Sequence, residues 1–262
     1  MNASSAKTRI KCVVWDLDNT LWDGVLLESS TLPPLRPHVS NVIKALDQRG
    51  ILQSVASKNE PELAMAALAA HGIDHYFLYP QISWGAKSQA ISHIAERLNI
   101  GIDTFAFIDD QPFERDEVLS VHPCIRTFTE ARLEHLSELE DFIPLHVTED
   151  SKKRREMYQK EALRNQAEED FKGPQDAFLR TLGLALRLKP ASEEDLYRAE
   201  ELTVRTNQLN TTGVTYSAEQ LRDLIDSDHH QVIVAELEDK YGSYGAIGLL
   251  LISEQPGRWC VD

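Results

Sequence analysis

The chain has little cysteine, little positive charge and no long apolar run, and each shortage excludes a class of protein. Its 262 residues include only three cysteines, Cys12, Cys124 and Cys260, too few and too scattered for a disulfide framework or a zinc knuckle. No apolar stretch reaches the length of a membrane span, and the polar residues 1–11 lack the apolar core of a signal peptide. We therefore expect a cytoplasmic protein with no membrane partner.

Basic residues are outnumbered by acidic ones, 27 to 42, which gives a formal net charge of −15. This surplus argues against nucleic acid as a partner, because the phosphate backbone would be repelled. A phosphorylated substrate would be repelled at long range too, so its site needs local cations, for which Lys58 and Lys87 are candidates. The one dense basic run, residues 152–155, is explained about equally well by a solvated helix face and by a docking patch.

Short apolar runs alternate with helical patterns in the first half of the chain. The apolar runs cover residues 10–15, 51–56, 75–79, 104–108 and 124–128. The helical patterns lie at about 38–49, 60–71, 87–98 and 112–120. Such alternation predicts βαβ units around a parallel sheet, and hence an α/β fold. With 42% hydrophobic residues the chain can bury a substantial core.

Two aspartates interrupt the first apolar run. Asp16 and Asp18 follow Trp15, and a regular strand would hold both on one side. At the carboxyl end of a parallel strand that side opens into the crevice where α/β proteins bind ligands. Two carboxylates crowded there repel each other unless a cation lies between them, which favours a Mg²⁺ site with one aspartate free to attack phosphorus. A loop with two solvated aspartates explains a bare Asp-x-Asp pattern more simply. The choice between this loop and a Mg²⁺ site therefore depends on the motifs in the rest of the chain.

Further polar residues follow strand ends or open helices, in a fixed order. Ser57 ends the second apolar run, Lys87 opens a helical pattern, and Asp109 and Asp110 end the run 104–108. Ser57 can donate a hydrogen bond to a phosphoryl oxygen, and Lys87 can neutralise a phosphoryl group. The structural alternatives are a helix N-cap for Ser57 and a solvated helix-start lysine for Lys87.

The ordered set of Asp-x-Asp, Ser, Lys and Asp-Asp resembles the four motifs of the haloacid dehalogenase (HAD) superfamily of phosphotransferases. The resemblance implies a HAD-like Rossmannoid parallel sheet flanked by helices. It implies Asp16 as the nucleophile, Asp18 as the general acid and base, and Ser57 and Lys87 as the other catalytic residues. The implied ligands of Mg²⁺ are Asp16, Asp18, Asp109 and Asp110, with Asp110 slightly preferred over Asp109 as the direct one.

Four segments are more specific than these motifs. They are Trp-Asp-Leu-Asp-Asn-Thr-Leu-Trp-Asp-Gly (15–24), Ser-Lys-Asn (57–59), Phe-Ile-Asp-Asp-Gln-Pro-Phe-Glu-Arg (107–115) and Arg-Thr-Asn-Gln-Leu-Asn-Thr-Thr (205–212). Together they look like the FkbH-like family of bacterial polyketide assembly lines, and the match runs through nearly the whole chain. The resemblance implies dephosphorylation of 1,3-bisphosphoglycerate and transfer of the glyceryl unit to the phosphopantetheine thiol of an acyl carrier protein. The cysteine that would accept the acyl group is not identified.

Six residues are candidates for contact with the substrate: Asn59, Trp84, Arg115, Asn207, Gln208 and Asn210. Each has a structural alternative. Trp84 suits a buried core as well as a pocket wall, and Arg115 can pair with Glu114. The three polar residues of the segment 205–212 suit hydrogen bonding to a hydroxylated acyl group or a pantetheine arm, or an ordinary capped loop.

We expect three parts along the chain: a HAD-like domain at 1–150, a charged linker helix at 151–172, and a second domain at 173–262. In the second domain, Ser192 and Ser217 occupy capping-box-like positions, and strand patterns follow near 184–188, 232–237 and 246–253. This order resembles the first half of an acetyltransferase-like (GNAT-like) α+β fold. The chain stops as another strand pattern begins, so this domain looks incomplete.

Three functional classes compete. The leading one is a Mg²⁺-dependent phosphatase that also transfers the glyceryl unit to a carrier protein. A plain HAD small-molecule phosphatase is the alternative, and it would not need residues 173–262. A receiver-like signalling module also uses clustered aspartates and a lysine. The receiver-like module is disfavoured because its first acidic residues lie apart from the phosphoacceptor aspartate. In this chain Asp16 and Asp18 share one strand end.

Overall fold

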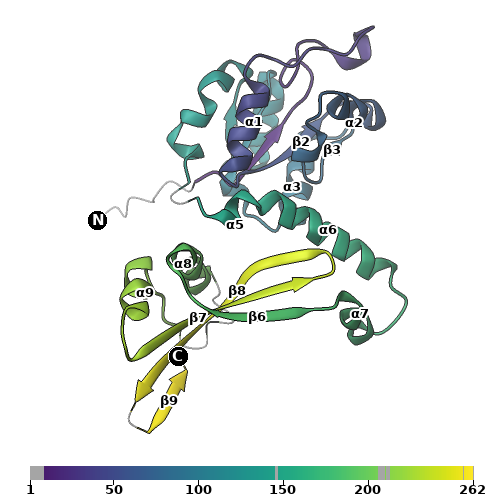
Figure 1. Cartoon of the computed structure of the whole chain (residues 1–262). Helices are drawn as coiled ribbons and strands as arrows, with labels where there is room; N and C mark the ends of the chain where they lie inside the picture. The colour runs from purple at the N-terminus through teal and green to yellow at the C-terminus, as the bar shows by residue number, and fades with distance from the viewer. Residues whose placement is uncertain (1–8, 145–146, 206–209, 211–212, 256, 262) are drawn as a thin grey trace. The chain divides into compact units, whose positions relative to one another are not determined.

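A computed structural model describes residues 9–144, 147–205, 210, 213–255 and 257–261 (Figure 1). The chain divides into two compact units, Met1–Tyr158 and Gln159–Asp262. The division falls inside the segment for which the sequence predicts a linker helix. Among the described residues, no helix is both long enough and apolar enough to cross a membrane.

The first unit is built on a five-stranded parallel sheet of order β3-β2-β1-β4-β5. Its strands are β1 (Cys12–Trp15), β2 (Leu52–Ser57), β3 (Gln81–Ile82), β4 (Phe105–Ile108) and β5 (Arg126–Phe128). The strand β1 is central and wholly buried, which suits its continuous apolar sequence, because helices cover both faces of a parallel sheet. The expected Rossmannoid parallel sheet is confirmed.

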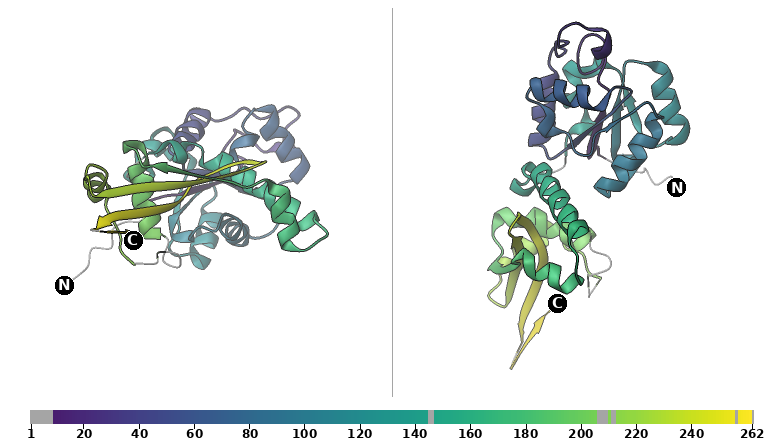
Figure 2. Two further views of the ribbon diagram at one scale, coloured as in Figure 1. Left: turned by 60° about the horizontal axis from the view of Figure 1, so that its bottom comes forward. Right: turned by 90° about the vertical axis from the view of Figure 1, so that its right-hand side faces the viewer.

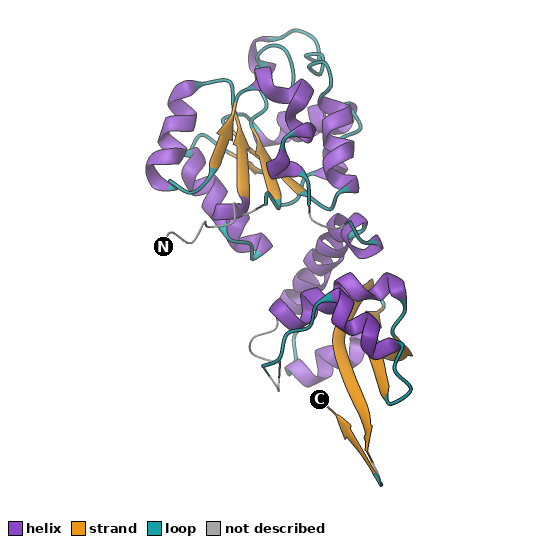
Figure 3. Cartoon of the chain, turned by 90° about the vertical axis from the view of Figure 1, so that its left-hand side faces the viewer, coloured by secondary structure: helices purple, strands orange, loops and turns teal. Residues whose placement is uncertain are grey.

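Helices cover both faces of this sheet (Figure 3). The helices α1 (Val39–Gln48) and α2 (Pro61–Ala70) pack with Val13 and Trp15 of β1. The helices α3 (Lys87–Leu98) and α4 (Pro112–Val121) pack with Cys12 and Val14. The alternation of β1 side chains between two cores follows from the pleat of the strand. Cys12 is thus a buried core residue, as its position predicts.

Two sequence expectations in this unit are wrong. The strand expected at 75–79 is a short 3-10 helix, η2 (Asp74–Tyr76), followed by one isolated bridge between Phe77 and Gln53. Tyr79 has a φ of 50°, a left-handed conformation that breaks an extended run, so the strand pairing resumes only at β3. Cys124, which opens the apolar run expected as a strand at 124–128, is exposed, and β5 begins only at Arg126.

Short helices complete the first unit and its connection to the second. They are η1 (Leu26–Glu28), η3 (Ile102–Thr104), η4 (Glu130–Glu138), η5 (Glu140–Phe142) and α5 (Glu149–Lys152). The helix η4 buries Leu133 and Leu136 in the same core as α1. The following α6 (Arg154–Asp170) crosses the division between the units.

In the basic run at 152–155, Lys152 and Lys153 are exposed, whereas Arg154 and Arg155 contact the first unit. The docking patch stays a prediction. Arg154 donates from Nη1 to the carbonyl of Gly50 at 3.0 Å. Arg155 pairs with Asp47 at 2.8 Å and lies over the ring of Tyr76. Both arginines therefore fasten the start of α6 to the first unit. Helical periodicity shows nothing of such contacts, because their partners lie about a hundred residues away in the chain.

The second unit is a four-stranded antiparallel sheet of order β6-β7-β8-β9. Its strands are β6 (Ala185–Pro190), β7 (His230–Asp239), β8 (Gly242–Gln255) and β9 (Arg258–Val261), and β7 and β8 form the long hairpin in Figure 2. Its other elements are α7 (Gln175–Leu182), η6 (Glu193–Asp195), α8 (Leu196–Arg205) and α9 (Ala218–Ile225).

Leu196 and Leu221, from α8 and α9, pack with Val232 and Val234 of the sheet. Both expected capping boxes are present, at Ser192 and Ser217. The second, antiparallel sheet is confirmed, whereas its likeness to an incomplete acetyltransferase-like domain stays a prediction.

Candidate active site

Lys87 is the centre of a buried ionic cluster at the carboxyl ends of β1 and β4. Its ammonium donates to Asp16 Oδ1 at 2.7 Å and also contacts Asp109 Oδ2. Asp16 directly follows β1 and Asp109 directly follows β4, and these two strands are neighbours in the sheet. All three side chains are buried. The parallel register thus brings the carboxylates of Asp16 and Asp109 together, and the first turn of α3 places the ammonium of Lys87 between them.

Asp110 completes a group of three carboxylates. One oxygen from each of Asp16, Asp109 and Asp110 lies within 4.8 Å of the others. The backbone N–H of Asp110 donates to Thr20 Oγ1 at 3.0 Å, and that hydroxyl donates back to Asp110 Oδ1 at 3.3 Å. Asp109 Oδ1 accepts from the N–H of Gln111 at 2.8 Å. Backbone and hydroxyl donors therefore orient the carboxylates that follow β4.

Burial dominates the electrostatics of this cluster. It raises the pKa of Asp16 to about 6, an effect that Lys87 opposes and the charge of Asp109 reinforces. Burial also raises the pKa of Asp109, against the influence of Lys87. Burial alone would lower the pKa of Lys87, but the two carboxylates outweigh it, so the pKa of this ammonium lies above its usual range. The ammonium is therefore charged at neutral pH.

The donor set fits a divalent cation. Three carboxylates facing one ammonium leave two negative charges uncompensated, and two of the three carboxylates are buried. Mg²⁺ prefers oxygen ligands and commonly takes one or two carboxylates. Asp16, Asp109 and Asp110 are the residues that would hold it. Asp109 and Asp110 both offer an oxygen to the group.

Asp18 lies outside this group, which corrects the expectation of four clustered carboxylates. The strand β1 ends at Trp15, so the alternation of a regular strand does not extend to Asp18. Its Oδ1 accepts from Trp22 Nε1 at 2.7 Å and from the N–H of Leu26 at 3.0 Å. Its Oδ2 accepts from Asn59 Nδ2 at 3.0 Å. These donors hold the carboxylate in a loop beside the cluster rather than within it.

Asn59 orients Asp18 and does not face a substrate. The side chain is fully buried, and its amide oxygen accepts from the N–H of Glu60 at 2.9 Å. Both ends of the amide are thus engaged within the protein. The expected contact of Asn59 with substrate is therefore corrected to a positioning role.

Ser57 is the last residue of β2 and Lys58 follows it, and the two side chains differ in their contacts. Ser57 is buried, and its hydroxyl makes no hydrogen bond with any residue that the structure describes. Lys58 pairs with the buried carboxylate of Glu114 at 2.7 Å, so it is a partnered cation. Arg115 instead donates to the carbonyl of Asp109, so its structural alternative, an ion pair with Glu114, is not found among the described residues.

The remaining candidates for substrate contact lie in different surroundings. Trp84 is 65% exposed, which excludes the core alternative. Arg115 donates from Nη1 to the backbone carbonyl of Asp109 at 2.6 Å. Asn210 donates to the carbonyl of Val214 at 2.8 Å and accepts from the N–H of Gly213, as in an ordinary capped loop. Asn207 and Gln208 lie outside the described residues.

Sequence reasoning missed Glu117 altogether. Its carboxylate accepts from the N–H of Ser88 at 3.1 Å and from the Ser88 hydroxyl, at the first turn of α3. A carboxylate at a helix N-terminus satisfies an otherwise unpaired N–H and interacts favourably with the helix dipole. Since Ser88 follows Lys87, Glu117 fixes the turn that carries the ammonium. No local pattern signals this contact, because 29 residues separate the partners.

Comparison with known proteins yields structural neighbours only. No protein-family model matches the chain, and no curated protein matches it. The N-terminal part of BF1531 from Bacteroides fragilis, which contains a phosphatase domain complexed with Mg, is 28% identical. That match covers 53% of this chain and 41% of that chain, with a TM-score of 0.44.

Two further neighbours are less similar in sequence. The 3-deoxy-D-manno-octulosonate 8-phosphate phosphatase from Moraxella catarrhalis is 22% identical over 38% of this chain and 57% of that chain, with a TM-score of 0.31. A HAD-superfamily hydrolase from Geobacter sulfurreducens is 13% identical over 51% of this chain and 99% of that chain, with a TM-score of 0.40. The chain thus spans less than two thirds of the length of the first two proteins.

Proposed function

We propose that this chain is a Mg²⁺-dependent phosphatase of the HAD type, with Asp16 as the nucleophile. The observation that carries the proposal is the convergence of Asp16, Asp109 and Asp110 around the ammonium of Lys87 at two neighbouring strand ends. A buried carboxylate nucleophile, a fixed cation and oxygen ligands for a metal are the parts that phosphoryl transfer to an aspartate requires.

Each residue then has a chemical task. The carboxylate of Asp16 attacks phosphorus, and the bond from phosphorus to the leaving oxygen breaks as that oxygen takes a proton from Asp18. Water next attacks the aspartyl-phosphate, gives a proton to Asp18 and releases inorganic phosphate. Lys87 offsets the negative charge that develops on the phosphoryl group, and the unpaired hydroxyl of Ser57 donates to one of its oxygens. Bound Mg²⁺ would reduce the repulsion between the phosphoryl group and the carboxylates.

For the substrate we propose 1,3-bisphosphoglycerate, from which Asp16 removes the phosphoryl group of the ester at C3. The phosphopantetheine thiol of an acyl carrier protein attacks the acyl carbon C1, whose bond to the other phosphate breaks, so that the glyceryl unit becomes a thioester and inorganic phosphate leaves. The support is the resemblance of segments 15–24, 57–59, 107–115 and 205–212 to the FkbH-like family. The last of these segments follows, in the chain, the unit that carries Asp16, and a plain phosphatase would not need it. A plain small-molecule phosphatase is the second candidate, because the ionic cluster alone suffices for phosphate release.

Mass spectrometry of a phosphopantetheinylated carrier protein separates the two candidates. The carrier is incubated with 1,3-bisphosphoglycerate, Mg²⁺ and the enzyme, and released phosphate is measured in parallel. A glyceryl thioester on the carrier, absent with Asp16→Asn, is the expected result. Release of phosphate without carrier loading would leave only the plain phosphatase, and release of no phosphate at all would reject both.

A further inference from the structure

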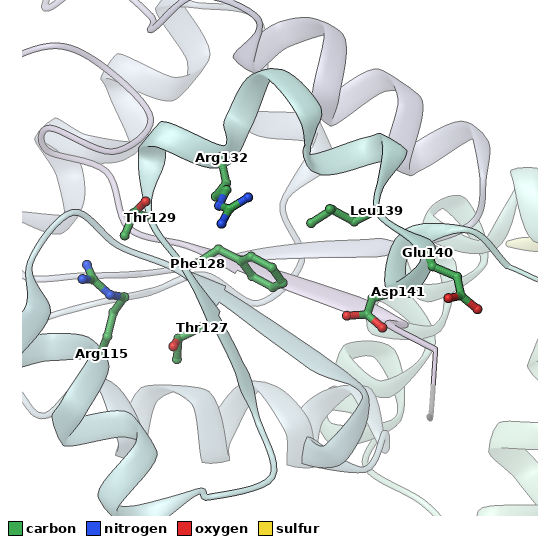
Figure 4. A pocket seen from close by; sticks show the side chains of 8 residues that line it. All are labelled: Arg115, Thr127, Phe128, Thr129, Arg132, Leu139, Glu140 and Asp141. Carbon is green, nitrogen blue, oxygen red and sulfur yellow. The ribbon is translucent and has the colours of Figure 1, made fainter. Parts of the chain in front are cut away.

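A cavity of about 510 Å³ lies in the first unit beside β5, the last strand in the order of its sheet. Its wall comes from α4, from β5 with the residue after it, and from η4 and η5. Figure 4 shows the eight lining residues: Arg115, Thr127, Phe128, Thr129, Arg132, Leu139, Glu140 and Asp141. A volume of this size falls in the range of small-molecule pockets. None of the residues proposed to act on phosphorus lines it.

The charges on the wall are unevenly compensated. Glu140 pairs with Arg9 at 3.0 Å, and Asp141 lies 3.6 Å from Arg126. Each acidic residue of the wall thus has an arginine partner. Within the described part of the chain, Arg115 and Arg132 have no carboxylate partner. The cavity therefore keeps a local surplus of positive charge in a protein whose net charge is −15.

Arg115 and a hydroxyl group lie at one end of the cavity, and Arg132 lies between that end and the acidic one (Figure 4). In Figure 4, Arg115 and Thr129 lie at the end opposite Glu140 and Asp141, and Arg132 reaches from η4 over the ring of Phe128. Arg115 donates one N–H to the carbonyl of Asp109. This hydrogen bond orients the guanidinium, whose other N–H groups can donate to a ligand. The Thr127 and Thr129 hydroxyls make no hydrogen bond to any other described residue. Donors thus line the cavity from the end at Arg115 to the ring of Phe128.

We propose that this cavity binds a small molecule through a phosphate or carboxylate group held by Arg115 and Arg132. A guanidinium presents a planar fork of N–H donors that matches either anion, and charge-assisted hydrogen bonds of this kind are strong. The threonine hydroxyls add donors, and Phe128 and Leu139 contact the apolar part of the ligand. The proposal does not depend on the proposed phosphatase activity, since it needs neither Lys87 nor the metal.

The test uses NMR titration of the full chain in EDTA at constant ionic strength, with inorganic phosphate and malonate as separate probes. We expect saturable shifts in the side-chain Nε–H signals of Arg115 and Arg132 and in the backbone amides of residues 127–129. Arg132→Gln should weaken this binding at least tenfold, because half of the guanidinium pair is lost. Arg180→Gln is the matched control, since it removes the same charge from an exposed position on α7.

The two probes distinguish the sources of the anion. Shifts with phosphate alone identify a phosphorylated ligand, and shifts with malonate identify a carboxylate ligand. The proposal is overturned if neither probe gives saturable shifts at residues 127–129, or if Arg132→Gln binds as tightly as Arg180→Gln. Hydrolysis of p-nitrophenyl phosphate, measured in parallel with Mg²⁺, reports the Asp16 site separately. Failure of one site is therefore distinguishable from failure of the other.

Discussion

Lys87 Nζ lies 2.7 Å from Asp16 Oδ1, although 71 residues separate the two in the chain. The contact exists because β1 ends at Trp15, beside the ends of β2 and β4, and because α3 begins at Lys87 itself. Breaking a buried ion pair by removing one partner is costly, whereas the intact pair contributes little to stability. Such a pair is better explained by chemistry than by stability, and the following predictions test this.

Lys87→Met should lower phosphate release by on the order of 10²-fold or more, because a fixed charge facing the phosphoryl group is lost. The variant should also unfold at a lower temperature, since Asp16 and Asp109 lose their cation. Phosphate release and thermal unfolding are the measurements. Lys44→Met, on the exposed side of α1, is the matched control and should resemble the unaltered protein. Turnover by Lys87→Met at the rate of Lys44→Met would contradict the assignment.

Asp16→Asn should abolish phosphate release while the fold stays intact, because an amide keeps the shape of the carboxylate but is a poor nucleophile. In the absence of metal the variant should be at least as stable as the unaltered protein at pH 7. Burial raises the pKa of Asp16 to about 6, so folding with this group ionised carries a cost that the amide avoids. Lys87 is not left unpaired in the variant, because it keeps Asp109 as a partner. Circular dichroism melts in EDTA check the second expectation. Asp228→Asn, at an exposed position, serves as the control.

Thr20→Val should raise the Mg²⁺ concentration needed for half-maximal activity by about 10- to 100-fold, the effect typical of residues that orient metal ligands. The hydroxyl of Thr20 both accepts from and donates to Asp110, and valine does neither. Titration of activity with Mg²⁺ measures the shift, and excess EDTA should abolish activity in every variant. Thr31→Val, in an exposed loop, should titrate like the unaltered protein. Activity that persists in EDTA would exclude the metal requirement.

Asp239→Asn should destabilise the second unit. Burial alone would raise the pKa of Asp239, but hydrogen bonds from Arg164, Tyr244 and two backbone N–H groups outweigh it and lower the pKa to about 2. A carboxylate with a depressed pKa stabilises the fold fully above its unfolded pKa of about 4, and this contribution is lost as the pH falls toward 2. The shift corresponds to at most about 2 to 3 kcal/mol, at about 1.4 kcal/mol per pKa unit.

Urea melts of the second unit's transition at pH 7 and pH 3 give the test for Asp239. The unaltered protein should lose stability between these values, and Asp239→Asn should lose less. Asp223→Asn is the control, because it makes the same substitution at an exposed position on α9, without the buried contacts of Asp239. Equal pH dependence in the two variants would show that Asp239 is not the titrating group.

Much of the fold was predictable because its signals are local. The helices α1 to α4 begin and end within one residue or so of their expected positions. Periodicity marks all four, and a proline at the first turn marks α2 and α4. The strand at 75–79 was mispredicted because the sheet edge is decided by Tyr79, whose positive φ no residue pattern announces. The left-handed conformation of Tyr79 thus explains why β3 begins at Gln81 and not in the expected range 75–79.

The sequence by itself determined which residues end the central strands and open the helices, and so which side chains were candidates: Asp16, Ser57, Lys87, Asp109 and Asp110. These choices depend on the burial and polarity of consecutive residues, which a sequence displays directly. Only the tertiary structure decided that Asp18 lies outside the carboxylate group, that Glu117 caps the turn of Lys87 and that Arg155 is bound to Asp47. Asp18 with Asn59, Glu117 with Ser88 and Arg155 with Asp47 are pairs separated by 29 to 108 residues, so only the folded chain brings them together and no local pattern displays them.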